Sequence, residues 1–284
     1  MKYKVSILIP TYNRSYLLER AINTSLNQTY DCEIIVCDHG SSDSTYEICK
    51  NYGDKINYLR REKDYGLHFC EIEALLAAKG ELIHFCFDDD WMHPKYIEKS
   101  VSFFNEEIGM VYCDYELIDL DGELIDKKEW NINPYNSIEK INIFSGSMRV
   151  LKGLISPSCA LLRRNDALSC MYLTNNLLSS KSYSGVGPDW LMTAMPIFRY
   201  KNCIKINEKL VRFGNHSSSI TIDAQEEFYS NKAKSFRAAY TGARLYLIIS
   251  TIIRILRLEP FYFFIEETFR ESRRALRKIK EKLL

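Results

Sequence analysis

The sequence lacks a strong net charge and a long apolar run, and we expect it to lack a secretion signal. Its 38 basic and 37 acidic residues give a formal net charge of +1, so composition gives no reason to expect a nucleic-acid partner. The N-terminal residues lead directly into a strand-like segment, from which we expect no signal peptide. Leu245–Ile253 is apolar and uncharged, but it is too short to span a bilayer.

The cysteines also lack the patterns that usually reveal metal or redox chemistry. There are nine of them, without a Cys-x-x-Cys pair and without spacing typical of zinc ligands. Some, such as Cys37 and Cys86, lie within strand-like segments. We therefore interpret them as reduced, mostly buried thiols of a cytoplasmic protein. His39, like the other histidines before residue 100, shows no mutual ligand spacing and predicts no chemistry.

What the sequence does contain is the composition of an ordinary globular protein. Hydrophobic residues make up 46% and charged residues 26% of the 284 positions, which is enough chain for one large domain with a substantial core. The charge is distributed unevenly, because the segment 270–282 is strongly basic. The length suits one domain, or one domain with a helical appendage.

The first part of the chain predicts a strand, a helix and a second strand. Val5–Ile9 is a compact apolar run that stops at Pro10, and Glu33–Cys37 is a similar run that ends at Asp38. Apolar residues recur at helical spacing between them, after Ser15 as the expected N-cap. A βαβ unit of this kind predicts an α/β fold whose polar residues gather at the carboxyl ends of the strands.

Three consecutive carboxylates follow a later strand-like segment. A helix predicted over 71–79, with Gly80 as its C-cap, leads into a strand over 81–87 and then into Asp88, Asp89 and Asp90. Neighbouring carboxylates repel unless a cation compensates them, and their oxygens are ligands that Mg²⁺ or Mn²⁺ prefers. The sequence therefore suggests a divalent metal at the edge of the sheet. A solvated acidic turn that caps the next helix is the alternative.

Motifs that occur in order along the chain resemble those of the family 2 glycosyltransferases. They are Ile-Pro-Thr-Tyr-Asn-Arg at 9–14, Ser-Leu-Asn-Gln-Thr-Tyr at 25–30, Asp-His-Gly-Ser-Ser-Asp at 38–43 and Asp-Asp-Asp-Trp-Met-His-Pro at 88–94. These enzymes are inverting and have the GT-A fold, a Rossmann-like mixed α/β sheet flanked by helices. The resemblance is strong over residues 3–115 and looser to about 220.

The resemblance implies a division of the chain and a set of donor-site residues. Residues 1–115 would bind the nucleotide sugar, 116–225 would form the acceptor-binding and catalytic half of the same domain, and 226–284 would form a basic amphipathic helical tail. The residues expected at the nucleotide and donor sugar are Pro10, Thr11, Tyr12, Arg14, Asp38, Asp88 and Asp89. Tyr12 would stack on the base, and Asp38 would accept a hydrogen bond from the uracil imide. Glu71 stands where many relatives carry a donor-contacting arginine, so the donor sugar cannot be transferred from them.

The resemblance also implies a metal and a catalytic base. Asp89 would coordinate Mn²⁺ or Mg²⁺, which neutralises the diphosphate leaving group. Asp90 would assist or only cap the following helix, and His216 would approach the metal or only be a solvated loop residue. Asp189 matches the base that takes the acceptor hydroxyl proton. It could equally act as a helix N-cap, and both roles are compatible.

The C-terminal tail combines an apolar face with a basic cluster. This combination is typical of an interfacial helix on an anionic membrane surface, here the inner face of the cytoplasmic membrane. Packing of the tail on the domain, or formation of a homo-oligomer through it, is the alternative.

The sequence thus predicts a metal-dependent transferase that moves a sugar from a nucleotide-diphosphate donor, with UDP as the expected nucleotide. The acceptor would be a glycan or lipid-linked glycan of a cell-surface polysaccharide such as a capsule or lipopolysaccharide. One rival is a nucleotidyltransferase, which would need a Gly-rich basic loop where the chain has Pro10–Asn13. The other is a non-enzymatic nucleotide-sugar-binding scaffold.

Overall fold

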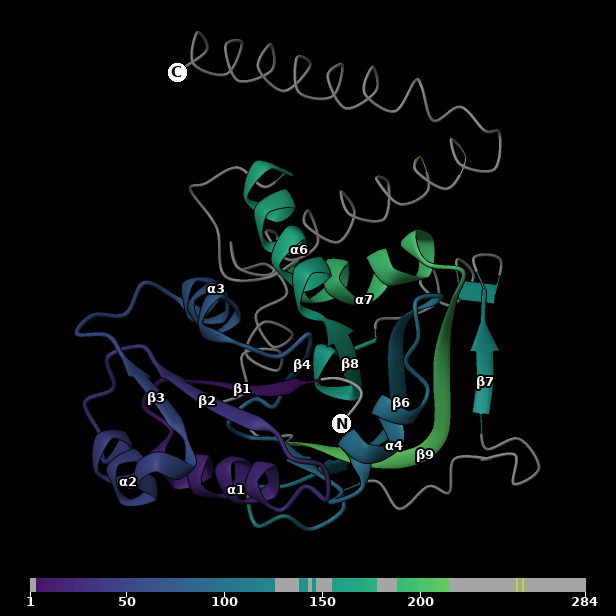
Figure 1. The fold of residues 1–284 in the computed structure, drawn as a ribbon. Coiled ribbons are helices and arrows are strands. Elements are labelled where there is room, and N and C mark those ends of the chain that lie inside the picture. The colour runs from purple at the N-terminus through teal and green to yellow at the C-terminus, as the bar shows by residue number, and fades with distance from the viewer. Residues whose placement is uncertain are drawn as a thin grey trace, which may run out of the picture. The chain divides into compact units, whose positions relative to one another are not determined.

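The computed structural model describes most of the first 214 residues (Figure 1). The described residues are 4–125, 138–142, 145–146, 155–177, 188–214, 249 and 252. The chain divides into two compact units, Met1–Tyr240 and Thr241–Leu284. The predicted tail lies almost entirely outside the described residues, so its membrane role stays a prediction. No helix in the described part of the chain is long and apolar enough to cross a membrane.

The first unit is built on a nine-stranded mixed sheet. The strands are β1 (Val5–Thr11), β2 (Glu33–Asp38), β3 (Asn57–Arg60), β4 (Leu82–Phe85), β5 (Trp91–Met92), β6 (Ile108–Ile118), β7 (Ile138–Ile141), β8 (Ala160–Arg163) and β9 (Asn202–Gly214). Their order is β3-β2-β1-β4-β8-β6-β9-β5, and β7 also pairs with β9. The strands from β3 to β4 run parallel, whereas β8 is antiparallel to both of its neighbours. This mixed α/β architecture confirms the predicted fold class.

Helices cover both faces of the parallel strands (Figure 1). They are α1 (Ser15–Leu26), α2 (Thr45–Tyr52), α3 (Leu67–Ala77), α4 (Tyr96–Ser102), α6 (Arg164–Leu177) and α7 (Pro188–Arg199), with short 3-10 turns at Gly53–Lys55 and Pro157–Cys159. Helices α1 and α2 lie on one face of β1–β3, and α3 lies on the other. Because both faces are covered, the strand residues Ile7, Leu8 and Ile9 are all fully buried. This explains why β1 reads as a continuous apolar run.

Two local predictions were wrong. Ser15 is not an N-cap but the first residue of α1, and its backbone N–H donates to Asp43 Oδ2 at 2.8 Å. The other oxygen of Asp43 accepts from the backbone N–H of Thr45 at 3.1 Å, so this carboxylate satisfies the start of both α1 and α2. A residue distant in sequence therefore supplies the partner that a local cap would have supplied.

The helix predicted over 71–79 begins earlier and ends sooner, as α3. Gly66 precedes it with a φ of +92°, a conformation that glycine adopts without strain. Gly80 is not its C-cap. A Cβ atom at Gly80 would lie 2.5 Å from the backbone nitrogen of Ser6, so glycine is needed there for close approach to β1.

Candidate donor site

The polar residues at the carboxyl ends of β1, β2 and β4 lie at one edge of the sheet, as the βαβ pattern predicted, and those that follow β1 and β4 are in contact. Strand β1 lies between β2 and β4, and Thr11 is in register with Asp38 at the ends of β1 and β2. Thr11 Oγ1 donates to Asp88 Oδ2 at 2.9 Å, in a buried hydrogen bond that joins residues 77 positions apart. The segment after β4 is thereby fixed against the end of β1.

Arg14 supplies a positive charge to the carboxylates that follow β4. Its Nη1 lies 3.1 Å from Asp88 Oδ1 and 3.3 Å from Asp89 Oδ2. Burial disfavours the charged guanidinium, but the attraction of Asp88 and Asp89 outweighs it and raises the pKa of Arg14. Thr11, Arg14, Asp88 and Asp89 therefore form one buried polar group, which we call the acidic edge.

Burial governs the protonation of the acids in this region. It raises the pKa of Asp88, and repulsion by Asp89 adds to this, whereas Arg14 and Thr11 oppose it. Burial and Asp89 likewise raise the pKa of Asp90 well above its usual range. The resident arginine thus compensates only part of the negative charge, as expected where a further cation would bind.

Asp90 faces different partners from the other two acids. Its carboxylate accepts from the Ser158 hydroxyl and from the backbone N–H of Gly214. Among the residues that the structure describes, the three consecutive acids do not bring three carboxylate oxygens within 4.8 Å of one another. Asp88 and Asp89 have the hard oxygen atoms that suit Mn²⁺ or Mg²⁺, and metal ligation by Asp89 and Asp90 stays a prediction.

The end of β9, at Gly214, packs against the backbone of Asp89. A Cβ atom at Gly214 would lie 2.6 Å from the backbone oxygen of Asp89, so only glycine allows this approach. Arg20 also reaches this backbone, because its Nη2 donates to the Asp89 carbonyl oxygen at 3.0 Å. Sequence reasoning missed the contacts of Arg20, Ser158 and Gly214, since no local pattern links them to the acids.

Tyr12 lies beside the acidic edge with its side chain largely open to solvent. It is 45% exposed, while its neighbours Pro10 and Thr11 are buried in β1. Asn13 has a φ of +52°, and its Oδ1 accepts from the backbone N–H of Ser42 at 2.8 Å. The turn after β1 is therefore held to the loop after β2, and it leaves the Tyr12 ring accessible to a base.

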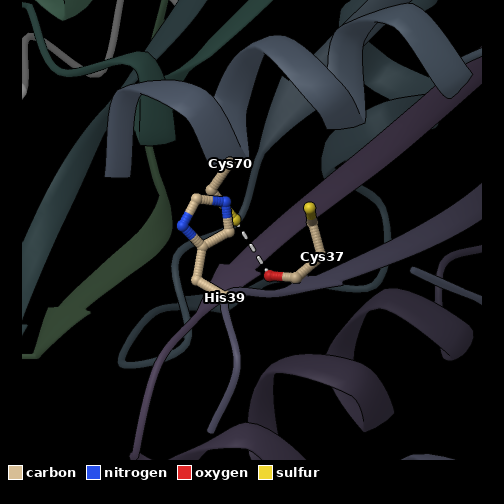
Figure 2. A group of neighbouring side chains, drawn as sticks. All are labelled: Cys37, His39 and Cys70. Carbon is tan, nitrogen blue, oxygen red and sulfur yellow. Dashed lines mark hydrogen bonds between the residues drawn. The ribbon is translucent and has the colours of Figure 1, made fainter. Parts of the chain in front are cut away.

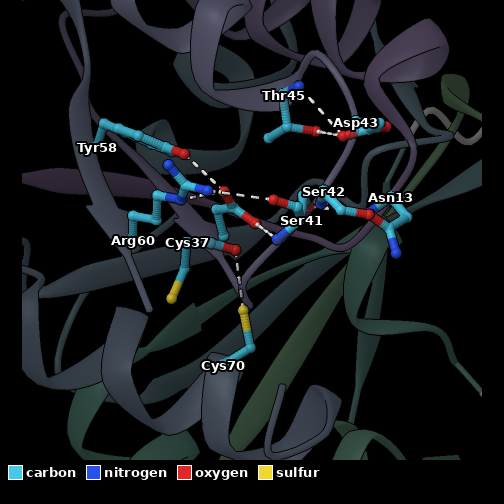
Figure 3. Close-up of polar contacts among 10 residues, drawn as sticks. Asn13, Cys37, Ser41, Ser42, Asp43, Thr45, Tyr58, Arg60 and Cys70 are labelled. Carbon is cyan, nitrogen blue, oxygen red and sulfur yellow. Dashed lines mark hydrogen bonds and ion pairs between the residues drawn. The ribbon is translucent and has the colours of Figure 1, made fainter. Parts of the chain in front are cut away.

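Asp38 is fully buried, and both of its carboxylate oxygens already have partners within the protein. Oδ1 accepts from the backbone N–H of Ser41 at 2.8 Å, and Oδ2 accepts from the Tyr58 hydroxyl at 2.6 Å. Figure 3 shows Ser41, Tyr58 and Arg60 in this region. Arg60 Nε lies 3.7 Å from Oδ2. In this arrangement Asp38 holds the loop after β2 in place, and the hydrogen bond to a base that the resemblance implied stays a prediction.

The structure does not test whether Asp189, the predicted base, and His216, the predicted metal ligand, belong to this site. Asp189 is the second residue of α7, inside the first turn of the helix, so the alternative that it is the N-cap was wrong. Its side chain lies outside the described residues, and so does the whole of His216. Their predicted roles stay predictions.

The covered sheet and the polar carboxyl edge define an α/β protein of the nucleotide-binding GT-A class. The family model of glycosyl transferase family 2 matches residues 6–167, and the chain belongs to that family.

The curated relatives are glycosyltransferases of greater length. An uncharacterized glycosyltransferase of Rickettsia typhi, RT0329, is 40% identical over 119 residues, which is 40% of this chain and 37% of that protein. The chondroitin synthase of Pasteurella multocida is 27% identical over 228 residues, or 78% of this chain and 22% of the synthase. The chain thus spans only a minor part of these relatives.

Solved structures show the same fold at low sequence identity. Residues 1–349 of Staphylococcus aureus TarS in complex with UDP give a TM-score of 0.58 at 17% identity, covering 83% of this chain and 69% of that one. A mannosyltransferase from Pyrobaculum calidifontis, in complex with GDP-Man and Mn²⁺, gives a TM-score of 0.51 at 14% identity. The match covers 97% of this chain and 81% of the mannosyltransferase chain.

Proposed function

We propose that this protein is a metal-dependent inverting glycosyltransferase that moves a sugar from a nucleotide-diphosphate donor, a UDP-sugar in our prediction, to a glycan hydroxyl. The observation that carries the proposal is the acidic edge. Four side chains from two segments 74 to 77 residues apart converge there, next to an exposed aromatic ring. Family membership and the UDP complex of TarS support the donor class.

Each part of the site has a role in donor binding. The Tyr12 ring would stack on the base, a contact that contributes about 1–3 kcal/mol in nucleic-acid systems. Asp88 and Asp89 would hold Mn²⁺ or Mg²⁺, which supplies Lewis-acid stabilisation of the diphosphate leaving group. Arg14 would orient both carboxylates before the donor arrives. The Mn²⁺ in the mannosyltransferase complex supports a metal in this fold.

The chemical step needs a base on the acceptor side. In our proposal Asp189 takes the proton of the acceptor hydroxyl while that oxygen attacks the anomeric carbon. The diphosphate leaves from the opposite face, so no covalent enzyme intermediate is formed. A positioned carboxylate of this kind typically contributes about 10²–10⁴-fold to the rate. Replacing Asp189 with asparagine should abolish sugar transfer and retain donor binding. If the protein were a non-enzymatic scaffold, the same replacement would leave its cellular role intact.

Calorimetric titration tests the donor site. UDP, GDP, CDP and dTDP would each be titrated with and without Mn²⁺ into the wild type and into Asp89→Ala. We expect metal-dependent UDP binding that Asp89→Ala loses. Asp31→Ala, which changes an exposed carboxylate at the amino end of β2, is the matched control and should bind normally. Binding of none of the four nucleotides would favour the scaffold function.

The acceptor and the cellular site belong to the same proposal. The chondroitin synthase of Pasteurella multocida and the putative glycosyltransferase EpsH of Bacillus subtilis support a surface polysaccharide as the product. We propose that the basic tail brings the enzyme to an anionic membrane surface where a lipid-linked acceptor would lie. Deleting residues 244–284 should then abolish sedimentation with anionic vesicles, and unchanged sedimentation would exclude this role.

A further inference from the structure

A second cluster of potential metal ligands lies on the other face of β2, apart from the acidic edge. Cys37, His39 and Cys70 each offer a ligand atom, and these three atoms lie within 4.8 Å of one another. All three residues are buried, with exposed fractions of 0%, 2% and 1%. Figure 2 shows the three side chains gathered between the end of β2 and the start of α3. Sequence spacing did not reveal this group.

The alternation of side chains along β2 explains the separation of the two sites. Residues two apart on an extended strand point to the same face, and the residue between them points to the other. Cys37 and His39 therefore share the face that α3 covers, where Cys70 Sγ donates to the Cys37 carbonyl oxygen at 3.0 Å. Asp38 between them points to the opposite face, toward Tyr58.

The imidazole of His39 is prepared to act as a ligand. Its Nδ1 lies 3.2 Å from Asp64 Oδ1, and its ring also shares a hydrogen bond with the Cys37 side chain. An Nδ1–H that donates to a carboxylate leaves the lone pair on Nε2, which is the arrangement of metal-ligating histidines.

We propose that Cys37, His39 and Cys70 form a zinc site that ties the end of β2 to α3. Two thiolates and a neutral imidazole around Zn²⁺ carry no net charge, so the loaded site suits a buried position. The two thiol protons pass to solvent when the metal binds. With Zn–S bonds of about 2.3 Å, tetrahedral ligand atoms lie about 3.8 Å apart, so the present cluster needs to contract by only about 1 Å.

Neighbouring groups complete the site. Glu73 Oε2 lies 3.7 Å from Cys37 Sγ and would supply the fourth ligand. The negative charge of this carboxylate is balanced by its ion-pair partner Arg61, so the loaded site stays neutral overall. The backbone N–H of His39 donates to the Thr11 carbonyl oxygen at 3.1 Å, so the metal would also stabilise the strand ends that carry the acidic edge. The proposal does not depend on the donor or on the reaction.

Cobalt(II) substitution distinguishes this site from an oxygen-ligand site without relying on any variant. The full-length protein, reduced and freed of metal, would be titrated with Co²⁺ alone. We expect one equivalent to give a thiolate-to-cobalt charge-transfer band together with the visible bands of tetrahedral cobalt. The absence of a charge-transfer band would overturn the proposal. Asp89→Ala should leave the spectrum unchanged, because its carboxylate belongs to the acidic edge.

Zinc affinity, measured by competition with a chromophoric chelator, identifies the ligands. Cys37→Ser and Cys70→Ser should each lose the charge-transfer contribution of one thiolate and bind Zn²⁺ at least 100-fold more weakly. Cys49→Ser, which alters a buried thiol on α2, is the matched control and should bind normally. If Cys49→Ser lost as much zinc affinity as Cys37→Ser and Cys70→Ser, Cys37 and Cys70 would not be the ligands.

Asp64→Asn changes the carboxylate that contacts His39 Nδ1 and leaves the three proposed ligands in place; the asparagine oxygen can still accept from the backbone N–H of Gly66. Replacing the hydrogen-bond partner of a ligating histidine typically weakens metal binding by about 10–100-fold, and we expect a loss in this range. Since Asp64 is well exposed, with 39% of its side chain accessible, this variant should fold even if the buried cysteine variants do not. Wild-type zinc affinity in Asp64→Asn would contradict the role of His39 as a ligand.

Discussion

Replacing Arg14 with glutamine would test whether its charge holds the acidic edge together. Arg14 Nη1 lies 3.1 Å and 3.3 Å from oxygens of Asp88 and Asp89. Two unit charges about 4 Å apart interact by about 4 kcal/mol at an effective dielectric constant of 20. Breaking a buried ion pair by removing one partner typically costs about 3–5 kcal/mol. Because 18% of the Arg14 side chain is exposed, we expect the lower end of that range, about 3 kcal/mol.

Urea unfolding in the presence of EDTA measures this loss. Arg20→Gln is the matched control, because among the described residues Arg20 bonds to the backbone carbonyl oxygens of Asp89 and Leu120 and to no carboxylate. It should cost about 1.5 kcal/mol, the lower end for hydrogen bonds of a charged group, because these bonds are exposed or partly exposed. The measurement is then repeated with Mn²⁺ in place of EDTA. If a cation can compensate the carboxylates, Mn²⁺ should stabilise Arg14→Gln more than it stabilises the wild type.

Two results would refute this reasoning. If Arg14→Gln and Arg20→Gln lost similar free energies of unfolding, the charge of Arg14 would not be what stabilises the acidic edge. If Mn²⁺ stabilised the wild type and Arg14→Gln equally, the metal and Arg14 would not be compensating the same carboxylates.

Further predictions concern the core that supports the site. Tyr58→Phe leaves the buried Asp38 with one partner fewer and should cost about 1–3 kcal/mol in urea unfolding; a neutral effect would contradict this. Burial lowers the pKa of His84 to about 4, so the unfolded chain binds a proton that the native state excludes. Stability should fall by up to about 3 kcal/mol as the pH drops from about 6.5 toward 4, and less steeply in His84→Asn. Gly109→Ala places a Cβ atom 2.3 Å from the Tyr200 ring and should lower stability by about 1–3 kcal/mol, measured as a reduced denaturation midpoint.

Much of the donor half was predictable from sequence because its signals are local. The apolar runs that became β1 and β2 are buried on both faces, so they are continuous and end abruptly at polar residues. Parallel strands joined by a helix bring their carboxyl ends to one edge, so the convergence of Thr11 with Asp88 followed from the βαβ pattern. The ordered motifs then led to the family.

The partners of the acids could not be predicted, because they come from distant segments. Nothing near Asp90 in sequence indicates that Ser158 and Gly214 donate to it, and these contacts depend on where β9 ends. The same holds for Asp43, whose second oxygen bonds to the start of α1 across the fold. Antiparallel insertion of β8 beside β4 likewise has no local signal.

The sequence by itself determined the α/β class, the strands of the donor half and the order of the acidic motifs. Those features depend on residue periodicity and on short-range spacing, which the chain carries wherever it lies in space. Only the tertiary structure brought Cys70 to Cys37 and His39, because α3 covers the face of β2 opposite to Asp38. Ligands from two separate elements have no fixed spacing along a chain, so their meeting is decided by packing.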